Sequence, residues 1–307
     1  MDFAQAVGPD GYVWWYLDGY SDDGQHGITL IAFIGSVFSP YYAWARRRGP
    51  ADPSNHCAVN VALYGPRGKR WAMTERGRTA LSRSTNHLQI GPSALSWDGA
   101  TLTVEVREIT VPLPSRLRGT IRIHAAPLVG QPFAIDTAGR HIWSPIAPAA
   151  RVEVEMHEPA LRWSGSGYLD TNRGTEPLEN AFAHWHWSRA PPGRGAALLY
   201  DVVTRQGDSV GLSLGIDGSG AVTHLEPPPR APLPGTGWRV DRSTRGDGGQ
   251  ARVLRTLEDT PFYARSLVDT QMWCERTTAF HESLSMPRFT TPVVQAMLPF
   301  RMPRRGG

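Results

Sequence analysis

Hydrophobic and polar residues alternate with a period of two along much of the chain, and this pattern predicts β-strands. Residues 57–64 form one expected strand, residues 65–69 a turn, and residues 70–75 the returning strand. Three further segments place aliphatic side chains on one face and polar or charged ones on the other: Leu102/Val104/Val106, Ile121/Ile123 and Val152/Val154/Met156. The 32 Gly and 26 Pro residues are spread along the chain and interrupt any long helix.

The alternation continues in the last third of the chain as a meander. The expected strands there are 196–205, 210–216, 221–225, 252–257, 263–270 and 272–280. Many short antiparallel strands at this spacing favour a sandwich or a barrel, and a barrel removes the exposed strand edges. We therefore expect a mainly β protein with few short helices.

Two segments lack the strand pattern and bear on the domain organisation. A length of 307 residues suggests one large or two medium domains. Residues 142–150, with Pro145 and Pro148 among several alanines, are the candidate linker between two β-halves, 1–148 and 149–307. The proline-rich residues 226–237 are expected to form a stiff loop that simply connects two strands.

Composition narrows the function classes. Hydrophobic residues make up 40% and charged residues 20%, which argues against a disordered chain and an integral membrane protein. The net charge of +4 favours an anionic surface as a partner, although solvated surface charges explain it more simply. Basic runs at 46–48, after Tyr41 and Trp44, and at 301–305 suggest peripheral contact with membrane lipid. No nucleic-acid-binding motif is present, so nucleic acid is not an expected partner.

The cysteines and the N-terminus bear on the compartment. Cys57 and Cys274 have no partner at metal-binding spacing, so neither a disulfide framework nor a zinc site is indicated. The first residues carry acids where a signal peptide needs a basic start, and the longest apolar stretch, 28–37, is too short to span a bilayer. We expect a protein on the cytoplasmic side, soluble or peripherally associated with a membrane.

Residues 165–187 concentrate groups that can do chemistry. In a strand, Tyr168 and Asp170 share one face. Trp185 and Trp187 likewise share one face, and His184 and His186 lie on the other. A carboxyl against aromatic surfaces is desolvated, which favours its protonated form and makes it a usable general acid. A turn is the alternative for Asp170, because Thr-Asn-Arg-Gly follows it.

Two other segments could contribute to a pocket. His141 and Trp143 share a face if 141–143 is a strand, and Trp14 and Tyr16 do so near the N-terminus, where they would line a wall. The acids at 18, 22 and 23 with His26 match no calcium or zinc pattern, and Asp-Gly turns explain most of them. No dinucleotide loop, phosphate loop or nucleophile elbow is present.

Long, aromatic-rich motifs carry a family resemblance. They are Tyr16-Leu-Asp-Gly-Tyr-Ser-Asp-Asp-Gly-Gln-His-Gly-Ile-Thr29, Ile31-Ala-Phe-Ile-Gly-Ser-Val-Phe-Ser-Pro-Tyr-Tyr-Ala-Trp44, Gly167-Tyr-Leu-Asp-Thr-Asn-Arg-Gly174 and His184-Trp-His-Trp187. With them the chain closely resembles, over most of its length, the carotenoid 1,2-hydratases of photosynthetic bacteria, also called hydroxyneurosporene synthases.

The resemblance implies a fold and an activity. The fold would be two lipocalin-like, calycin-type antiparallel β-barrel or sandwich halves. The activity would be addition of water, without a cofactor or metal, to the terminal 1,2 double bond of an acyclic carotenoid such as neurosporene or lycopene. The family's proposed site residues fall on His141, Trp143, Tyr168 and Asp170. Two alternatives stay open: a calycin that binds a carotenoid or another prenyl lipid without reaction, and a prenyl-lipid cyclase of similar fold.

A mechanism follows as a hypothesis. Asp170 would protonate the less substituted carbon of the double bond, leaving the charge on the tertiary carbon. Ring faces of Trp143 and Tyr168 would stabilise that cation by about 2 kcal/mol, and His141 would orient or deprotonate the attacking water. The side chains expected to contact the substrate are Trp185, Trp187, Trp14 and Tyr16.

Overall fold

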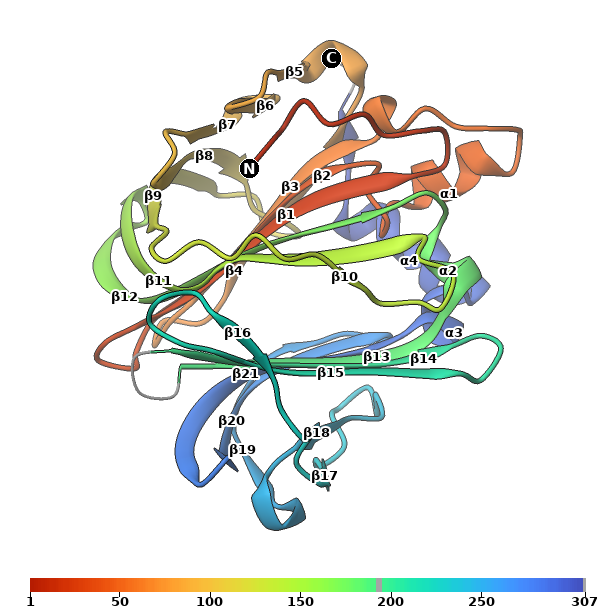
Figure 1. The fold of residues 1–307 in the computed structure, drawn as a ribbon. Helices are drawn as coiled ribbons and strands as arrows, with labels where there is room; N and C mark the ends of the chain where they lie inside the picture. The colour runs from red at the N-terminus through yellow and green to blue at the C-terminus, as the bar shows by residue number, and fades with distance from the viewer. Residues whose placement is uncertain (192–194, 306–307) are drawn as a thin grey trace. The chain divides into compact units, whose positions relative to one another are not determined.

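The computed structural model describes residues 1–191 and 195–305, and most of their regular structure is β (Figure 1). The mainly β prediction is confirmed. The strands of the first half of the chain are β1 (Tyr12–Ser21), β2 (Gly27–Ile34), β3 (Cys57–Tyr64), β4 (Arg70–Arg76), β5 (Leu81–Arg83), β6 (His87–Ile90), β7 (Ser93–Trp97), β8 (Thr101–Ile109), β9 (Arg116–His124), β10 (Phe133–Ala134) and β11 (His141–Glu158).

The rest of the chain adds strands and short helices. The strands are β12 (Ala160–Gly174), β13 (Phe182–Ala190), β14 (Ala196–Thr204), β15 (Ser209–Ile216), β16 (Val222–His224), β17 (Arg230–Pro232), β18 (Ser243–Arg245), β19 (Ala251–Asp259), β20 (Tyr263–Met272), β21 (Glu275–Ser285) and β22 (Arg304–Arg305). The α-helices of the described chain are α1 (Pro40–Arg46), α2 (Leu178–Ala181), α3 (Met286–Phe289) and α4 (Pro292–Arg301). None of these helices combines the length and hydropathy needed to cross a membrane.

The chain divides into two compact units that are each discontinuous in sequence. The first contains Met1–Phe133, Arg140–Pro177 and the end of the chain from Ala296, and the second contains Ala134–Gly139 and Leu178–Gln295. These units differ from the expected halves 1–148 and 149–307, because β11 runs without a break through residues 148 and 149. A boundary chosen from composition falls inside a strand here.

The expected linker at 142–150 is therefore wrong, since these residues belong to β11. The pairing of β11 with β12 shifts register between Pro145 and Ala147 and again between Ala147 and Ala150. Proline lacks a backbone N–H and is tolerated in a strand at such irregularities. Pro145 borders the first shift and Pro148 lies within the second, which lets the strand continue.

One curled sheet organises the first unit. Within the described residues it has 13 strands in the order β22-β4-β3-β2-β1-β12-β11-β9-β8-β7-β6-β5, with β10 paired to β11. The strand predictions at 57–64 and 70–75 are confirmed by β3 and β4. In β8, Leu102, Val104 and Val106 are fully buried while Glu105 and Arg107 are exposed, as the alternation predicted. These aliphatic side chains belong to the unit's hydrophobic core.

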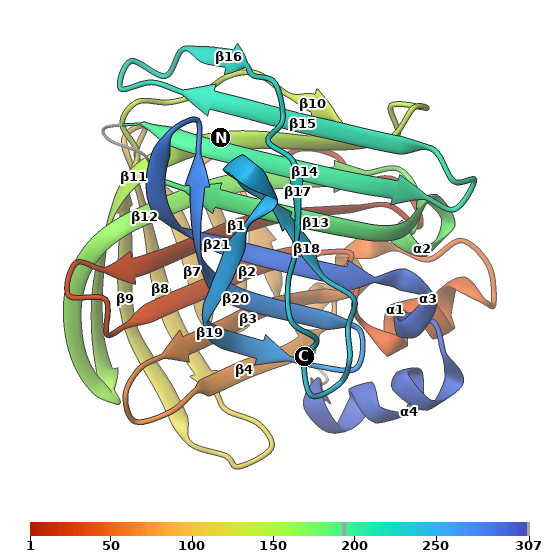
Figure 2. The same cartoon turned by 90° about the horizontal axis from the view of Figure 1, so that it is seen from below.

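A second sheet organises the second unit, with the order β16-β15-β14-β13-β21-β20-β19 (Figure 2). Two predictions are corrected here. Residues 272–280 are not one strand, because Trp273 and Cys274 adopt positive φ in the turn that joins β20 to β21. The proline-rich loop at 226–237 contains β17, which pairs with β18.

Cys57 and Cys274 are free, and burial raises the pKa of the Cys57 thiol to about 12.

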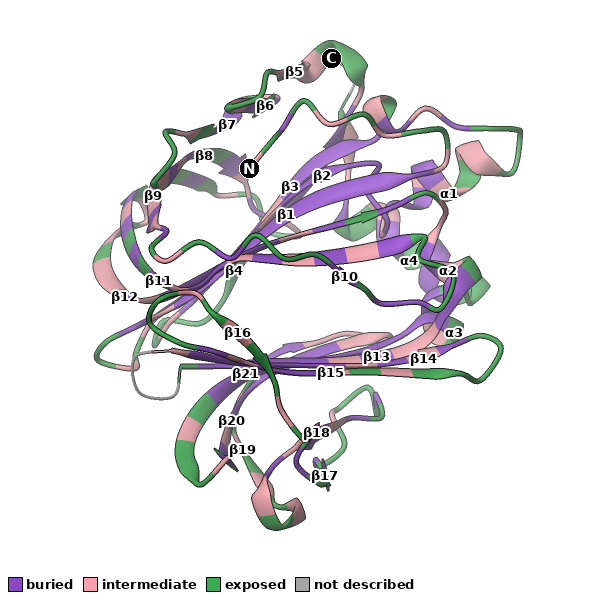
Figure 3. Cartoon of the chain, in the orientation of Figure 1, coloured by how far each residue is buried: buried purple, intermediate pink, exposed green. Residues whose placement is uncertain are grey.

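Strand β1 is buried on both faces, and Figure 3 shows it coloured as buried along most of its length. It lies between β2 and β12 in the sheet. Its odd-numbered side chains, Val13, Trp15 and Leu17, join the hydrophobic core. Its even-numbered side chains carry polar groups instead, and these side chains position the candidate site.

Candidate active site

Strand register places the four predicted catalytic residues, together with Trp14 and Tyr16, on one face of the first unit's sheet. In the β1–β12 pair, Tyr16 is opposite Asp170 and Asp18 is opposite Tyr168. In the β11–β12 pair, Trp143 is opposite Asn172. Residues directly opposite one another in an antiparallel pair project from the same face. The face is therefore built from three adjacent strands, and it is the face turned away from the hydrophobic core.

Asp170 is the centre of the site and is only 3% exposed. The indole Nε1–H of Trp143 and the hydroxyl of Tyr168 both donate to its Oδ2, each over 2.8 Å. Burial raises the pKa of Tyr168 well above its ordinary value, and the nearby Asp170 and Asp18 carboxyls raise it further. Tyr168 therefore stays a hydroxyl donor at neutral pH. The alternative of Asp170 in a turn is excluded, because the residue lies within β12.

His141 is buried at the start of β11 and is opposite Gly174, which lies four residues after Asp170 on β12. Its Nδ1 lies 2.8 Å from the Tyr12 hydroxyl and its Nε2 lies 3.4 Å from Oε1 of Glu176. Both ring nitrogens thus have polar neighbours, and a carboxylate beside one of them fixes the orientation of the ring. The structure brings His141 onto the same face as Asp170, with the Trp143 position between them.

Gly174 makes the contact between Tyr12 and His141 geometrically possible. It is opposite Tyr12 on β1 and opposite His141 on β11. A Cβ at this position would lie 2.4 Å from a Tyr12 ring carbon and 2.7 Å from Nδ1 of His141. Sequence reasoning missed Tyr12, Glu176 and this glycine. Tyr12 could have been found, because it extends the period-two row of Trp14, Tyr16 and Asp18.

Tyr16 belongs to a second phenol–carboxyl pair that the sequence analysis did not assign. Its hydroxyl donates to Oδ2 of Asp18 over 2.7 Å, and both residues are buried. The Tyr16 and Tyr168 rings meet edge to face, with centroids 5.9 Å apart. The same Tyr-x-Asp spacing therefore occurs on both adjacent strands, with each tyrosine opposite the other strand's aspartate.

The remaining predicted substrate contacts lie in different elements. Trp14 stacks on Tyr12 with ring centroids 4.9 Å apart, on the site face of β1. Trp185 and Trp187 are buried in β13 of the second unit, on the face opposite His186. Burial lowers the pKa of His186 to about 4, so its imidazole is neutral at physiological pH. Substrate contact by the tryptophans stays a prediction.

The other acidic residues near the N-terminus have structural roles. Asp23 accepts hydrogen bonds from the Ser21 hydroxyl and the Gln25 backbone N–H in the β1–β2 turn. Asp22 forms an ion pair with Arg151. Within residues 1–191 and 195–305, no group of three or more His, Cys, Asp or Glu side chains is placed to hold a metal ion.

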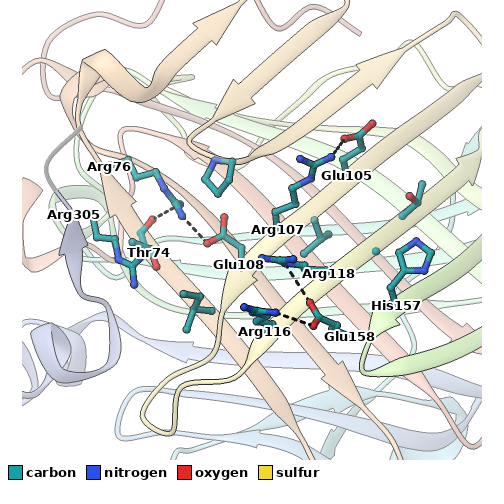
Figure 4. Close-up of a pocket in the computed structure, with 15 residues that line it drawn as sticks. Thr74, Arg76, Glu105, Arg107, Glu108, Arg116, Arg118, His157, Glu158 and Arg305 are labelled. Atoms are coloured by element: carbon teal, nitrogen blue, oxygen red, sulfur yellow. Dashed lines mark hydrogen bonds and ion pairs between the residues drawn. The ribbon is translucent and has the colours of Figure 1, made fainter.

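A cavity of about 800 Å³ in the first unit is distinct from this site (Figure 4). Its lining includes two ion pairs: Arg76 Nη2 lies 2.8 Å from Glu108 Oε2, and Arg118 Nε lies 3.3 Å from Glu158 Oε2. Burial raises the pKa of Glu108, while Arg76 opposes this shift. Charged walls of this kind are unsuited to a hydrocarbon ligand, and the cavity contains none of the predicted site residues.

Comparisons with known proteins identify the family. A family model described as "Carotenoid hydratase CrtC" matches residues 30–307. The acyclic carotenoid 1,2-hydratase of Thiocapsa roseopersicina is 61% identical over 99% of this chain and 76% of its own length. The enzyme of the same name from Rubrivivax gelatinosus is 52% identical over the same shares.

A solved AttH-type structure from Nitrosomonas europaea has the same fold, with a TM-score of 0.64 at 15% identity over 93% of this chain and 96% of its own. That likeness concerns the fold alone. The family model and the two hydratases confirm the resemblance seen in the sequence motifs. The chain therefore belongs to the carotenoid hydratase family.

Proposed function

We propose that this protein adds water to the terminal 1,2 double bond of an acyclic carotenoid such as neurosporene or lycopene, giving a tertiary alcohol. Membership of the hydratase family makes it a hydro-lyase, and its relatives are named for acyclic carotenoids. The observation that carries the proposal is the buried Asp170 carboxyl, held by an indole and a phenol on a face of aromatic side chains.

Asp170 is the proposed acid. Both hydrogen bonds, from Trp143 and from Tyr168, reach the same oxygen, Oδ2. This arrangement suits the carbonyl oxygen of a protonated carboxyl, whose Oδ1 would carry the proton. A neutral carboxylic acid beside a bound alkene can then transfer its proton to the less substituted carbon.

Aromatic rings would stabilise the tertiary cation. The Tyr168 and Trp143 side chains fix their polar atoms on Asp170, so their ring positions are set with respect to the acid. A cation over such a ring gains about 2 kcal/mol when it is desolvated. His141, oriented by Tyr12 and Glu176, would hold the polar end of the same face. Addition of water to an alkene involves no net oxidation or reduction, so an acid and a proton acceptor suffice without a cofactor.

Incubation of purified protein with lycopene in ¹⁸O-labelled water tests the function directly. We expect a tertiary alcohol that carries the label. Asp170→Asn should lower the rate by about 10²- to 10⁴-fold, the usual contribution of a general acid, while the thermal unfolding midpoint stays close to that of the wild type. Recovery of unreacted lycopene bound to wild-type protein would indicate a carrier, and an unlabelled cyclic product would indicate a cyclase.

We also propose that the protein contacts membrane lipid, where a carotenoid resides. Trp44 of α1 is 37% exposed and precedes three arginines. On α4, Val293 and Phe300 are 71% and 81% exposed, and their spacing of seven places them on one helix face. Exposed aromatic side chains beside basic ones favour an anionic lipid surface.

A flotation assay with phosphatidylcholine vesicles, with and without phosphatidylglycerol, tests this contact. We expect the wild-type protein to float with the anionic vesicles, and the Trp44→Ala/Phe300→Ser double variant to float less. Glu153→Gln, at an exposed position of β11, serves as the control variant. Absence of wild-type flotation with both vesicle types would contradict the proposal.

A further inference from the structure

The second Tyr-x-Asp pair, Tyr16 and Asp18, lies on the strand next to the proposed acid Asp170, and the proposed mechanism leaves it without a role. We infer that Asp18, together with Thr29, binds the attacking water and that the Asp18 carboxylate accepts its proton. This inference rests on the proposed hydration and assigns the other half of it. Asp18 is fully buried and accepts the Tyr16 hydroxyl through Oδ2.

Strand register sets the spacing of the two carboxyls. Asp170 is opposite Tyr16, so Asp18 is its diagonal neighbour on β1. Diagonal neighbours across an antiparallel pair are about 7–8 Å apart. That backbone spacing, with both side chains on one face, brings the two carboxyls close enough to act on the same bound double bond and water.

Thr29 on β2 provides an independent sign of a small polar ligand. It is directly opposite Asp18 in the β1–β2 pair, so both side chains project from the same face. Thr29 is 3% exposed, and its Oγ1 has no hydrogen-bond partner among the described residues. A buried hydroxyl without a partner is unfavourable, because it has lost its hydrogen bonds to water without replacing them. A water held between Oγ1 and the Asp18 carboxylate would satisfy it.

His141 is less well placed for this step than Asp18. His141 is opposite Gly174, and Gly174 is four residues from Asp170 on β12. Four residues of extended strand separate the two positions by roughly 13 Å. Its Nδ1 is beside the Tyr12 hydroxyl and its Nε2 beside Glu176. Asp18, by contrast, is one diagonal away from the acid. Tyr16 and Tyr168 lie beside the two carboxyls and donate hydrogen bonds to them.

The reaction then balances in protons and charge. The Asp170 O–H bond breaks and a C–H bond forms at the less substituted alkene carbon, leaving the cation on the tertiary carbon. Water oxygen bonds to that carbon and transfers one proton to the Asp18 carboxylate. Asp170 has lost one proton and Asp18 has gained one, and exchange with solvent restores both groups. The alkene and water become a tertiary alcohol with no other reactant.

Deuterium exchange separates the two carboxyls experimentally. In D₂O, an enzyme that protonates the alkene but fails to capture the cation returns alkene, because the ionised Asp170 removes a proton again. We expect Asp18→Asn to lower hydration of lycopene by about 10²-fold or more, while deuterium still enters the recovered lycopene at a rate within a few-fold of wild type. Asp170→Asn should lose both hydration and exchange.

Two further variants keep the test decisive. Thr29→Val keeps the branched shape and replaces the hydroxyl with a methyl group, and we expect it to lower hydration about tenfold with exchange retained. Glu153→Gln makes the same carboxyl-to-amide change at an exposed position and should leave both rates unchanged. Hydration by Asp18→Asn within a few-fold of wild type, or parallel loss of hydration and exchange, would overturn the role of Asp18. A wild-type protein that neither hydrates nor exchanges would instead reject the proposed function.

Discussion

The two faces of the sheet around β1 and β12 are both buried but differ in what they bury. Leu17 and Leu169, which are opposite one another, pack in the aliphatic core. The next residues along each strand, Asp18 and Asp170, project from the other face and accept hydrogen bonds from tyrosines. Adjacent residues of one strand thus belong to two environments, one that stabilises the fold and one equipped for proton transfer.

The difference shows that burial alone does not identify a functional face. On the core face, removing apolar surface from water is sufficient for Leu17, Leu169 and their aliphatic neighbours, because aliphatic side chains have no hydrogen bonds to satisfy. On the site face, each buried carboxyl needs donors, and the phenols supply them at set positions. That requirement fixes the directions of the polar atoms, which is the condition for directed proton transfer.

The largest expected effect in stability comes from the core face. Leu169→Ala should lower the free energy of unfolding by about 2–5 kcal/mol, because it removes buried methyl groups and leaves a cavity. Chemical denaturation monitored by tryptophan fluorescence measures it. Asp170→Asn, one residue away, should change stability far less but lower turnover by about 10²- to 10⁴-fold. Equal stability losses in the two variants would contradict the division between the faces.

A smaller effect on stability is expected at Gly174, within the site face. The Cβ of Gly174→Ala would overlap Tyr12 and His141, so we expect a loss of about 1–3 kcal/mol from overpacking. Displacing His141 by about 1 Å should also lower turnover by on the order of 10²-fold. Thermal unfolding and product formation are measured together. Gly130→Ala, whose Cβ would meet no atom within 4 Å, is the matched control.

The strands were predictable because their alternation reports directly which side chains are buried. The expected strand at 57–64 coincides with β3, and the alternation of Leu102, Val104 and Val106 was correct. The prediction at 142–150 failed because Pro145 and Pro148 imitate a linker, whereas register shifts accommodate them in β11. Proline content alone does not report where a strand is irregular.

Part of the candidate site could also be predicted from the period-two pattern of strands. Tyr168 with Asp170 and His141 with Trp143 stand two residues apart, so a strand places each pair on one face, and the family motifs pointed to all four. The hydrogen bond from Trp143 to Asp170 was not predictable, since it joins different strands. The same is true of Tyr12 beside His141, because that contact depends on Gly174 lying between them.

The sequence by itself determined the β class, most strand positions, the family and the residues that share a face within one strand. The period of two is a local property of the backbone, so it can be seen in a single segment. Only the tertiary structure decided which strands are neighbours and in what register, and thereby paired Tyr16 with Asp170 and Thr29 with Asp18. Register between distant strands is set by the packing of the whole sheet, and no single segment encodes it.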